Sequence, residues 1–340
     1  MEADKIGIVG AGSWGTALSL MLSSLGHSID LWVFEEDLCQ IMQEHRENRF
    51  FLPGYPLPGN VRPTHSFEEA VRGKNVLILV VPTHVVRETV SKLQPFIQPG
   101  CLVINASKGI ENDTLCTIHQ ILEQTIEVPI RLASVSGPTF AVEVARGVPS
   151  ALVAAAETLE IAEEVQGIFS HPRMKVFTST DLQGVEIGGA LKNVIAIATG
   201  ISDGLGLGYN TRAALITRGL VEITRIGTAR GARPETFAGL SGLGDLVLTC
   251  TGDLSRNRSV GMRLGKGENL NDIIHSMKMV AEGIRTVKSA FALKNQLNIQ
   301  ASLIEETYRV LHDDKSPQQA LDDLMKVNIT TEFSGIRGLQ

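Results

Sequence analysis

Cysteine and long hydrophobic runs are scarce in this chain of 340 residues. Its four cysteines, Cys39, Cys101, Cys116 and Cys250, lie far apart and form no CxxC pair, which excludes a disulfide scaffold and is typical of a reduced, cytoplasmic protein. The longest apolar run, residues 76–81, is far short of the ~20 residues that a membrane-spanning helix needs. We also expect no signal peptide, because the first residues lead into a strand-like run without a basic segment.

Metal-binding histidine patterns and an excess of basic residues are also absent. The eight histidines show neither HxxxH nor HExxH spacing, so the sequence predicts no metal site. A formal net charge of −6 argues against a protein that mainly binds nucleic acid. Any anion that the protein binds must therefore be held by a local cluster of donors.

The first half of the chain alternates short β-branched runs with longer helical segments. Continuous apolar runs separated by helices indicate parallel strands buried on both faces, so we expect an α/β doubly wound, mostly parallel sheet over residues 1–181. The expected strands are residues 5–10, 28–34, 75–81, 101–107, 131–137, 150–156 and 174–180. Residues 47–66, with four prolines and three aromatic residues, are predicted to form a long ordered loop, and such loops are commonly functional.

The second half has helical patterns and no strand signals. We expect an all-α domain over residues 182–327, with helices in segments 184–204, 211–231, 272–280, 286–296, 302–313 and 316–327. The last of these starts with Ser316, Pro317 and Gln319, a capping-box pattern. Residues 328–340 lack periodicity and are predicted to be a flexible tail.

A glycine motif follows the first expected strand. Gly10, Gly12 and Gly15 have the GxGxxG spacing, and a helix and a second strand follow at the distances of a dinucleotide-binding unit. Gly10 permits the tight turn, Gly12 lets the backbone approach a pyrophosphate, and Gly15 permits close packing of helix on strand. Glu35, which lies 20 residues after Gly15, is the candidate for the ribose 2′-hydroxyl. No arginine nearby could meet a 2′-phosphate, which favours NAD over NADP.

One lysine stands in the apolar segment 186–200. If that segment is helical, Gly188, Gly189, Ala196 and Thr199 share its face, so Lys192 would stand where something can approach it closely. A buried ammonium group must be paired or have a lowered pKa. Lys192 is therefore a candidate proton donor.

Three further segments have donors in suitable patterns. Lys108 and the segment Gly137-Pro138-Thr139 each follow an expected strand, where ligands of open α/β sheets bind. Asp245 follows three glycines and precedes an apolar strip. Ten residues later, Ser255, Arg256 and Asn257 supply a hydroxyl, a guanidinium group, an amide and a helix N-terminus, which together suit an anion.

These segments, taken in order, resemble the soluble bacterial type of NAD(P)-dependent sn-glycerol-3-phosphate dehydrogenase, from the first strand to about residue 327. The resemblance implies a Rossmann-like domain followed by a helical domain, a cytoplasmic homodimer, and NAD or NADP as cofactor. It implies reversible reduction of dihydroxyacetone phosphate to sn-glycerol 3-phosphate, which feeds phospholipid synthesis. It also implies that Lys192 is the general acid/base.

The resemblance assigns further roles position by position. The cofactor would be contacted, besides the three glycines, by Ser13, Trp14, Phe34, Lys108, Ala141, Arg256, Val280 and Glu282. The substrate would be contacted by Lys108, Gly137, Thr139, Lys192, Asp245, Ser255, Arg256 and Asn257. Asp245 would hold Lys192 in place, with Asn193 and Thr249 as further donors. The family often has basic residues where this chain has Val33, Phe34 and Glu35.

Three other interpretations of the sequence are weighed. A β-hydroxyacid dehydrogenase has Lys-x-x-x-Asn on this helix, whereas Ala196 lies four residues after Lys192 here. A sugar-nucleotide dehydrogenase needs a cysteine nucleophile, and Cys250 has no evident base beside it. A dinucleotide-binding sensor without chemistry would be expected to lack Lys192 or Asp245, and both are present.

Overall fold

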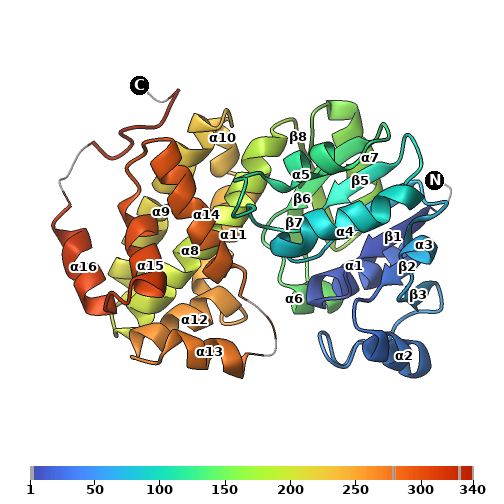
Figure 1. Cartoon of the computed structure of the whole chain (residues 1–340), viewed down its shortest axis with the longest axis horizontal. Coiled ribbons are helices and arrows are strands. Elements are labelled where there is room, and N and C mark those ends of the chain that lie inside the picture. Colours follow the sequence, from blue (N-terminus) through green and yellow to red (C-terminus); the bar gives the residue numbers. More distant parts are fainter. Residues whose placement is uncertain (1–3, 278, 280, 328–330, 339–340) are drawn as a thin grey trace. The chain divides into compact units, whose positions relative to one another are not determined.

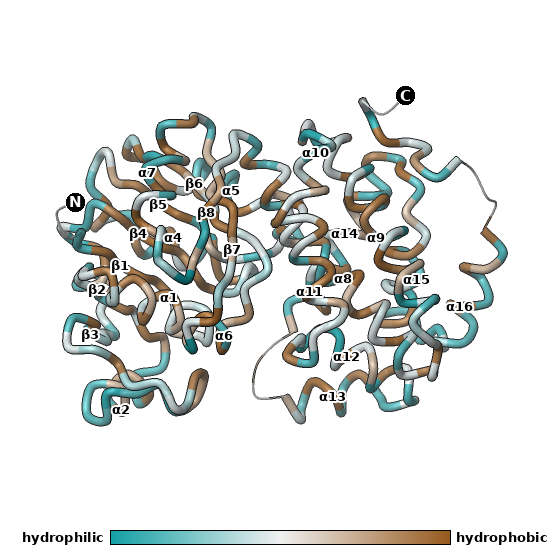
Figure 2. Tube along the Cα trace, turned by 180° about the vertical axis from the view of Figure 1, so that it is seen from behind, coloured by the Kyte–Doolittle hydropathy of each residue, from teal (hydrophilic) through white to brown (hydrophobic). Residues whose placement is uncertain are grey.

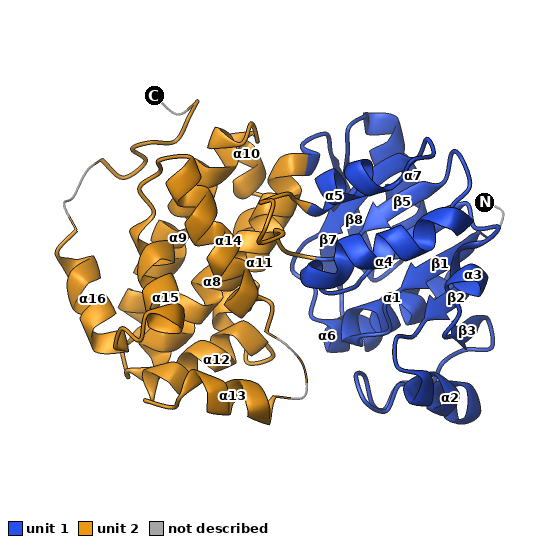
Figure 3. Cartoon of the chain, viewed as in Figure 1, with its two compact units in different colours: residues 1–107, 118–182 blue, residues 108–117, 183–340 orange. Residues whose placement is uncertain are grey.

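The chain folds into two compact units in the computed structural model, which describes residues 4–277, 279, 281–327 and 331–338 (Figures 1 and 3). Unit 1 comprises Met1–Ser107 and Ile118–Leu182, and unit 2 comprises Lys108–Thr117 and Gln183–Gln340. The excursion 108–117 thus leaves the first unit and belongs to the second. The sequence places the change from sheet to helices after residue 181.

Unit 1 is built on one sheet, which has eight strands in the part of the chain that the structure describes. Their order is β3-β2-β1-β4-β5-β6-β7-β8, and all neighbours are parallel except β6 and β7. The structure confirms the doubly wound, mostly parallel fold. The strands are β1 (Lys5–Val9), β2 (Ser28–Trp32), β3 (Val61–Thr64), β4 (Val76–Leu79), β5 (Leu102–Asn105), β6 (Arg131–Ser136), β7 (Ser150–Ala156) and β8 (Met174–Ser179).

Helices flank this sheet and bury its apolar strands. α1 packs on α6, α3 on α4, and α4 on α5, while α7 contacts β6, β7 and β8. Figure 2 shows hydrophobic residues concentrated along the central strands. The helical elements are α1 (Ser13–Ser24), α2 (Glu36–His45), α3 (Phe67–Val71), η1 (Thr83–Val85), α4 (Val86–Leu93), η2 (Gln94–Phe96), α5 (Ile118–Thr125), α6 (Ala141–Ala145) and α7 (Leu159–Phe169).

The expected long loop contains a strand that the sequence did not indicate. Its last part forms β3, which lies at the edge of the sheet and pairs only with β2 among the described strands. β3 has four residues and includes Pro63, which an edge strand tolerates because the missing N–H can face away from the ladder. The prediction of a loop throughout 47–66 was therefore wrong for its last part.

Unit 2 is helical and centres on α8 (Leu182–Gly204). By length and composition α8 is the one described helix that could cross a membrane, and its apolar window is entirely buried in the protein, as in a core helix. The capping box at Ser316 and Gln319 is confirmed. The other elements are α9 (Tyr209–Ala229), α10 (Pro234–Phe237), η3 (Leu240–Gly244), α11 (Asp245–Thr251), α12 (Arg256–Gly265), α13 (Leu270–Ser276), α14 (Gly283–Gln296), α15 (Ser302–His312) and α16 (Pro317–Met325).

Glycines bring α12 unusually close to α8. A Cβ atom on Gly200 would lie 2.1 Å from the carbonyl oxygen of Arg258, and one on Gly261 would lie 2.0 Å from that of Ile197. Only residues without side chains permit this separation. The crossing places the first turn of α12 beside the middle of α8.

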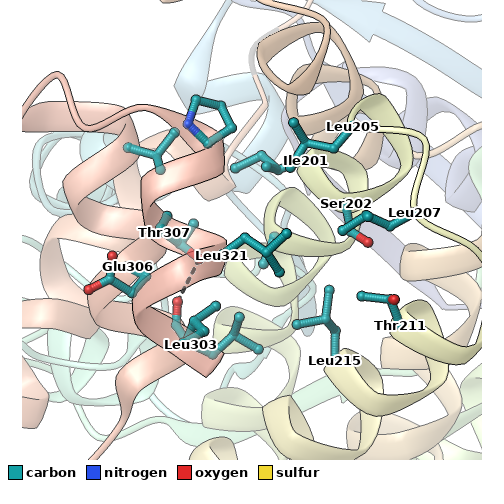
Figure 4. Close-up of a pocket in the computed structure, with 15 residues that line it drawn as sticks. Ile201, Ser202, Leu205, Leu207, Thr211, Leu215, Leu303, Glu306, Thr307 and Leu321 are labelled. Atoms are coloured by element: carbon teal, nitrogen blue, oxygen red, sulfur yellow. Dashed lines mark hydrogen bonds between the residues drawn. The ribbon is translucent and has the colours of Figure 1, made fainter. Parts of the chain in front are cut away.

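A small cavity of about 40 Å³ lies between α8, α9, α15 and α16 (Figure 4). Its lining is mainly apolar and includes the buried Ser202, whose hydroxyl has no hydrogen-bond partner among the described residues. Because a water needs about 10–15 Å³ of such space, the cavity of about 40 Å³ has room for about three waters, one of which could satisfy this hydroxyl.

The end of the chain lies against α9. Arg225 donates to the carbonyl oxygen of Ser334 over 2.6 Å, and Arg218 donates to that of Glu332 over 2.7 Å. Ile336 is buried. Residues 331–338 of the expected flexible tail are therefore anchored by hydrogen bonds and one apolar side chain.

Candidate functional site

The glycine turn of unit 1 has the geometry that a dinucleotide needs. Gly10 has a φ of +118°, which favours glycine, and a Cβ on Gly15 would lie 1.9 Å from the carbonyl oxygen of Gly10. A Cβ on Gly12, by contrast, would meet nothing within 4 Å. Gly12 also precedes α1 without a side-chain cap. Open space at an uncapped helix N-terminus fits a pyrophosphate.

Asn48 supports this turn, and the sequence did not single it out. Its amide nitrogen donates to the carbonyl oxygen of Ala11 and to the hydroxyl of Thr16, both over 2.8 Å, and its oxygen accepts from the N–H of Phe51. Asn48 is completely buried. It therefore joins the long loop to the glycine turn and fixes the position of Ala11 between the two glycines.

Aromatic rings gather where β2 ends, at the expected adenosine end of the site. Phe34 is 70% exposed, and its ring meets Trp32 edge-on with centroids 6.0 Å apart. Trp32 is stacked on Phe67 at 4.3 Å. Glu35 lies at the N-cap position of α2 and is exposed. An exposed ring on a rigid aromatic base can stack on an adenine.

The remaining candidates of unit 1 follow β6. Because β1, β4, β5 and β6 are parallel, the residues after β6 lie at the same edge of the sheet as the glycine turn. Gly137 has a φ of +152° and approaches Leu152 closely, and the Thr139 hydroxyl donates to the carbonyl oxygen of Gly137 over 3.3 Å. Ala141 opens α6.

The lysine in the middle of α8 is buried and paired in unit 2. The Nζ atom of Lys192 donates to Oδ1 of Asp245 over 2.6 Å and to the hydroxyl of Thr249 over 2.7 Å. Its side chain is 8% exposed. Asp245 and Thr249 lie one turn apart on α11, so a single helix supplies both partners.

The small residues beside this lysine serve the packing of the backbone. A Cβ on Gly188 would lie 2.9 Å from the carbonyl oxygen of Ser241, in the π-helical segment η3. Gly188 thus lets η3 approach α8, which sets the start of α11 and hence Asp245. The expectation that Gly188 leaves room for a ligand was wrong, because protein backbone fills the space.

A second lysine shares the same carboxylate. Nζ of Lys108, on the excursion 108–117, lies 2.5 Å from Oδ2 of Asp245. Asp245 therefore bridges two ammonium groups, one on each oxygen. Burial alone would raise the pKa of Asp245, but the charges of Lys108 and Lys192 outweigh it and hold that pKa below its usual value.

The pKa of Lys192 moves in the direction that proton transfer requires. Burial lowers it to about 8; the charge of Asp245 opposes this shift and that of Lys108 adds to it. A group with such a pKa can give and take a proton near neutral pH. The neighbouring thiol of Cys250 differs, because burial raises its pKa to about 12 and keeps it protonated.

The expected anion site lies at the first turn of α12. Ser255 is the N-cap, and its hydroxyl oxygen accepts from the N–H of Arg258 over 3.2 Å. Asn257 donates to Oδ1 of Asn193 and accepts from the N–H of Gly283, each over 2.9 Å. Since Asn193 follows Lys192 on α8, this turn lies beside the buried lysine.

Arg256 opens this turn, and the charge of Glu282 acts on it. Burial lowers the pKa of Arg256, and the charge of Glu282 opposes that shift. Glu282 lies at the N-cap position of α14. Val280, the other expected cofactor contact in this segment, lies outside the described residues.

An ion-pair network that the sequence did not indicate holds this turn in place. The buried carboxylate of Asp203 on α8 accepts from Arg212 of α9 over 2.6 Å and from Arg258 of α12 over 2.7 Å. Arg258 also pairs with Asp253. The ion pair between Arg258 and Asp203 thus ties the first turn of α12 to the last turn of α8, near the expected anion site.

Unit 2 thus brings together Lys108, Lys192, Asn193, Asp245, Thr249, Ser255, Arg256, Asn257 and Glu282. Unit 1 contains the glycine turn, Ser13, Trp14, Phe34, Gly137, Thr139 and Ala141. The first set has the groups expected of an acid/base and an anion site, and the second has those expected of a dinucleotide site.

Comparison with known proteins identifies the same two parts. The model "NAD-dependent glycerol-3-phosphate dehydrogenase N-terminus" matches residues 5–162, and the corresponding C-terminus model matches residues 181–322. A glycerol-3-phosphate dehydrogenase (NAD(P)+) of Geobacter metallireducens is 52% identical over 95% of this chain and 97% of its own length. One from Syntrophobacter fumaroxidans is 47% identical over 96% and 97% of the two chains.

Solved structures agree with this. The glycerol-3-phosphate dehydrogenase of Coxiella burnetii has a TM-score of 0.92 and 36% identity, covering 96% of this chain and 99% of that one. A D-mandelate dehydrogenase, with a TM-score of 0.62, 12% identity, and coverage of 93% and 99%, shares the fold alone.

Proposed function

This chain belongs to the NAD-dependent glycerol-3-phosphate dehydrogenase family, and from that premise we propose how its residues perform the family's reaction. The protein is an oxidoreductase that interconverts dihydroxyacetone phosphate and sn-glycerol 3-phosphate with NAD(P)H. The nicotinamide, when bound, supplies the hydride that reaches the ketone carbon. The observation that carries the assignment of roles is the buried lysine of α8, paired with a carboxylate that also holds a second lysine.

Lys192 gives the proton in the reduction. As the ketone carbon is reduced, negative charge develops on its oxygen, and the Nζ proton of Lys192 passes to that oxygen to complete the hydroxyl group. Asp245 and Thr249 accept hydrogen bonds from Nζ and so hold it in one direction. In the oxidation direction the neutral amine takes the hydroxyl proton.

Lys108 and Asp245 set the charge around that proton. The two ammonium groups and one carboxylate carry a net positive charge, which stabilises a developing alkoxide in a site screened from water. Lys108 also offers a cation to the substrate. Arg256, Ser255 and Asn257 then hold the substrate phosphate, so that binding energy away from the ketone positions the reacting carbon.

The glycine turn of unit 1 binds the dinucleotide, with Trp14 and Phe34 near its two ends. NADH is used at least as well as NADPH, because the end of β2 offers Phe34 and Glu35 where a 2′-phosphate would need cations. The domain roles follow: residues 1–181 bind the cofactor, and residues 182–327 carry the acid/base and the phosphate site.

The protein is a cytoplasmic homodimer in this proposal. Four widely spaced cysteines, all free, support a reducing compartment. The dimer rests on the resemblance to the family, and light scattering on the purified protein measures it directly.

Mixing the protein with NADH and dihydroxyacetone phosphate tests the activity. We expect NADH absorbance to fall with this substrate and only slowly with dihydroxyacetone, which lacks the phosphate. Arg256→Ala should lower kcat/KM for the phosphorylated ketone, mainly by raising KM. The loss of transition-state stabilisation should be ~1.5–3 kcal/mol, because one charge-assisted contact is lost. The rate with dihydroxyacetone should change little.

The matched control is Arg263→Ala, on the last turn of the same helix, where Arg263 pairs with Glu268 over 2.6 Å. It should leave both substrates unaffected. Equal loss with both substrates in Arg256→Ala would remove the phosphate role from this residue.

The pH dependence should differ between the two directions. Reduction needs protonated Lys192, so its kcat/KM should be constant at low pH and fall above about 8. Oxidation needs the neutral amine, so its kcat/KM should rise with pH through about 8. Rates measured from pH 6 to 10 in both directions check this, and breaks of the same sign in both directions would contradict it.

A further inference from the structure

We propose that His65 is a second determinant of cofactor choice, acting through the Nε2 atom of its ring, which suits a ribose 2′-hydroxyl and disfavours a 2′-phosphate. The inference rests on the proposed function of unit 1 as the dinucleotide site and deepens it. No motif in the sequence pointed to this residue, because it lies in the segment expected to be loop.

His65 directly follows β3, next to the end of β2. The two strands pair in parallel with Trp32 opposite Thr64, and the N–H of Val33 donates to the carbonyl oxygen of Thr64 over 2.8 Å. The indole N–H of Trp32 donates to the carbonyl oxygen of His65 over 3.1 Å. His65 is therefore held beside the residues at the end of β2, where the ribose of a bound dinucleotide lies.

A hydrogen bond determines which ring nitrogen carries the proton. Nδ1 of His65 lies 2.9 Å from the carbonyl oxygen of Val33. A carbonyl oxygen only accepts, so Nδ1 is the donor and bears a hydrogen. In the neutral ring Nε2 is then an acceptor, and in the charged ring it is a donor. The residue is exposed, so this edge is open to a ligand.

The two cofactors differ in what they can offer Nε2. A ribose 2′-hydroxyl can donate a hydrogen bond to the neutral ring. A 2′-phosphate has mainly acceptor oxygens and is attracted only by the charged ring. A ring that carries its proton on Nδ1 therefore offers NADH a hydrogen bond at Nε2 that it cannot offer NADPH.

Carboxylates lie on the neighbouring elements. One of them, Glu69 of α3, accepts from the hydroxyl of Thr64 over 2.6 Å. Their charges repel a 2′-phosphate. These carboxylates leave a neutral ribose 2′-hydroxyl unaffected, so they add to the discrimination against NADPH. The acidic residues at the N-terminal ends of α2 and α3 are Glu35, Glu36, Asp37, Glu68 and Glu69.

Dissociation constants of NADH and NADPH test the proposal without reference to turnover. Both tryptophans of the chain, Trp14 and Trp32, belong to unit 1, so their fluorescence reports binding there. At pH 8 His65→Ala, which removes the ring, should weaken the binding of NADH about fivefold and change that of NADPH much less, because only the ribose 2′-hydroxyl loses a hydrogen bond.

Two further variants sharpen the result. His65→Arg should bind NADPH about tenfold more tightly relative to NADH than the wild type at pH 8, because it adds a cation beside the 2′-phosphate. His45→Ala, at the last residue of α2, removes an exposed histidine of the same unit and should behave as the wild type.

Tight binding of both dinucleotides with the same ratio of dissociation constants in wild type, His65→Ala and His65→Arg would overturn this inference and leave the proposed function intact. Failure of the wild type to bind either dinucleotide would overturn both.

Discussion

Replacing Lys192 by methionine is expected to lower kcat for the reduction of dihydroxyacetone phosphate by ~10²–10⁴, the usual worth of a positioned acid/base. Methionine keeps an unbranched side chain of similar length in the slot between α8 and α11 and removes the proton. The affinity for NADH should stay nearly unchanged, because the glycine turn belongs to unit 1. Steady-state rates, together with an NADH dissociation constant, measure both quantities.

The pH profile is the control for this prediction. The break near pH 8 should disappear from the residual activity of the methionine variant. It should also disappear in Lys192→Arg, which keeps a positive charge at the site but does not release its proton in this pH range. If turnover of the methionine variant stays within a few-fold of the wild type, the proton comes from another group. Lys108, which shares Asp245 with Lys192, is then the first to replace.

Replacing Asp245 by asparagine should have the second largest effect. The change removes the charge that Lys108 and Lys192 share and that raises the pKa of Lys192. An adjacent opposite charge is worth ~1–3 pKa units, so the break in the reduction profile should move from about 8 toward lower pH. At pH 7.5 kcat/KM for reduction should fall by ~10–10², because most of the lysine is then neutral.

Thr249→Val is the matched control for this effect, since it removes the other hydrogen-bond acceptor of Lys192 without changing a charge. It should move the break much less than Asp245→Asn. Circular dichroism should show that both variants are folded. An unmoved break in a folded Asp245→Asn variant would mean that this carboxylate does not set the charge of the lysine.

Much of the fold could be predicted from the sequence because buried parallel strands are continuous apolar runs. The glycine turn could be predicted because each of its glycines meets a local backbone requirement, and local requirements are visible in a short stretch of sequence. β3 was missed because its four residues include Pro63 and follow a proline-rich loop. An edge strand is stabilised by one neighbour, and that partner is invisible in the strand's own pattern.

The site was harder to predict, because its contacts join distant positions. The pairing of Lys192 with Asp245 spans 53 residues, and nothing in the spacing indicates it. The resemblance to a family supplied that pair and named Lys108 as a site residue, and the structure adds that Lys108 shares the same aspartate. Asn48 and Asp203 had no signal at all, since a buried amide or carboxylate is identified by its partners, and the partners come from tertiary packing.

Lys108 reaches Asp245 on an excursion of ten residues, and this has a consequence for how such a chain can be divided or recombined. The polypeptide passes between its two units after residues 107, 117 and 182. A fragment starting at residue 183 would contain the aspartate and only one of its two cations. A hybrid made by joining the first 182 residues of one relative to the remainder of another would pair a lysine from one parent with an aspartate from the other. A cut at residue 182 therefore separates the sheet from the main helical segment but also divides the group of charged residues around Asp245.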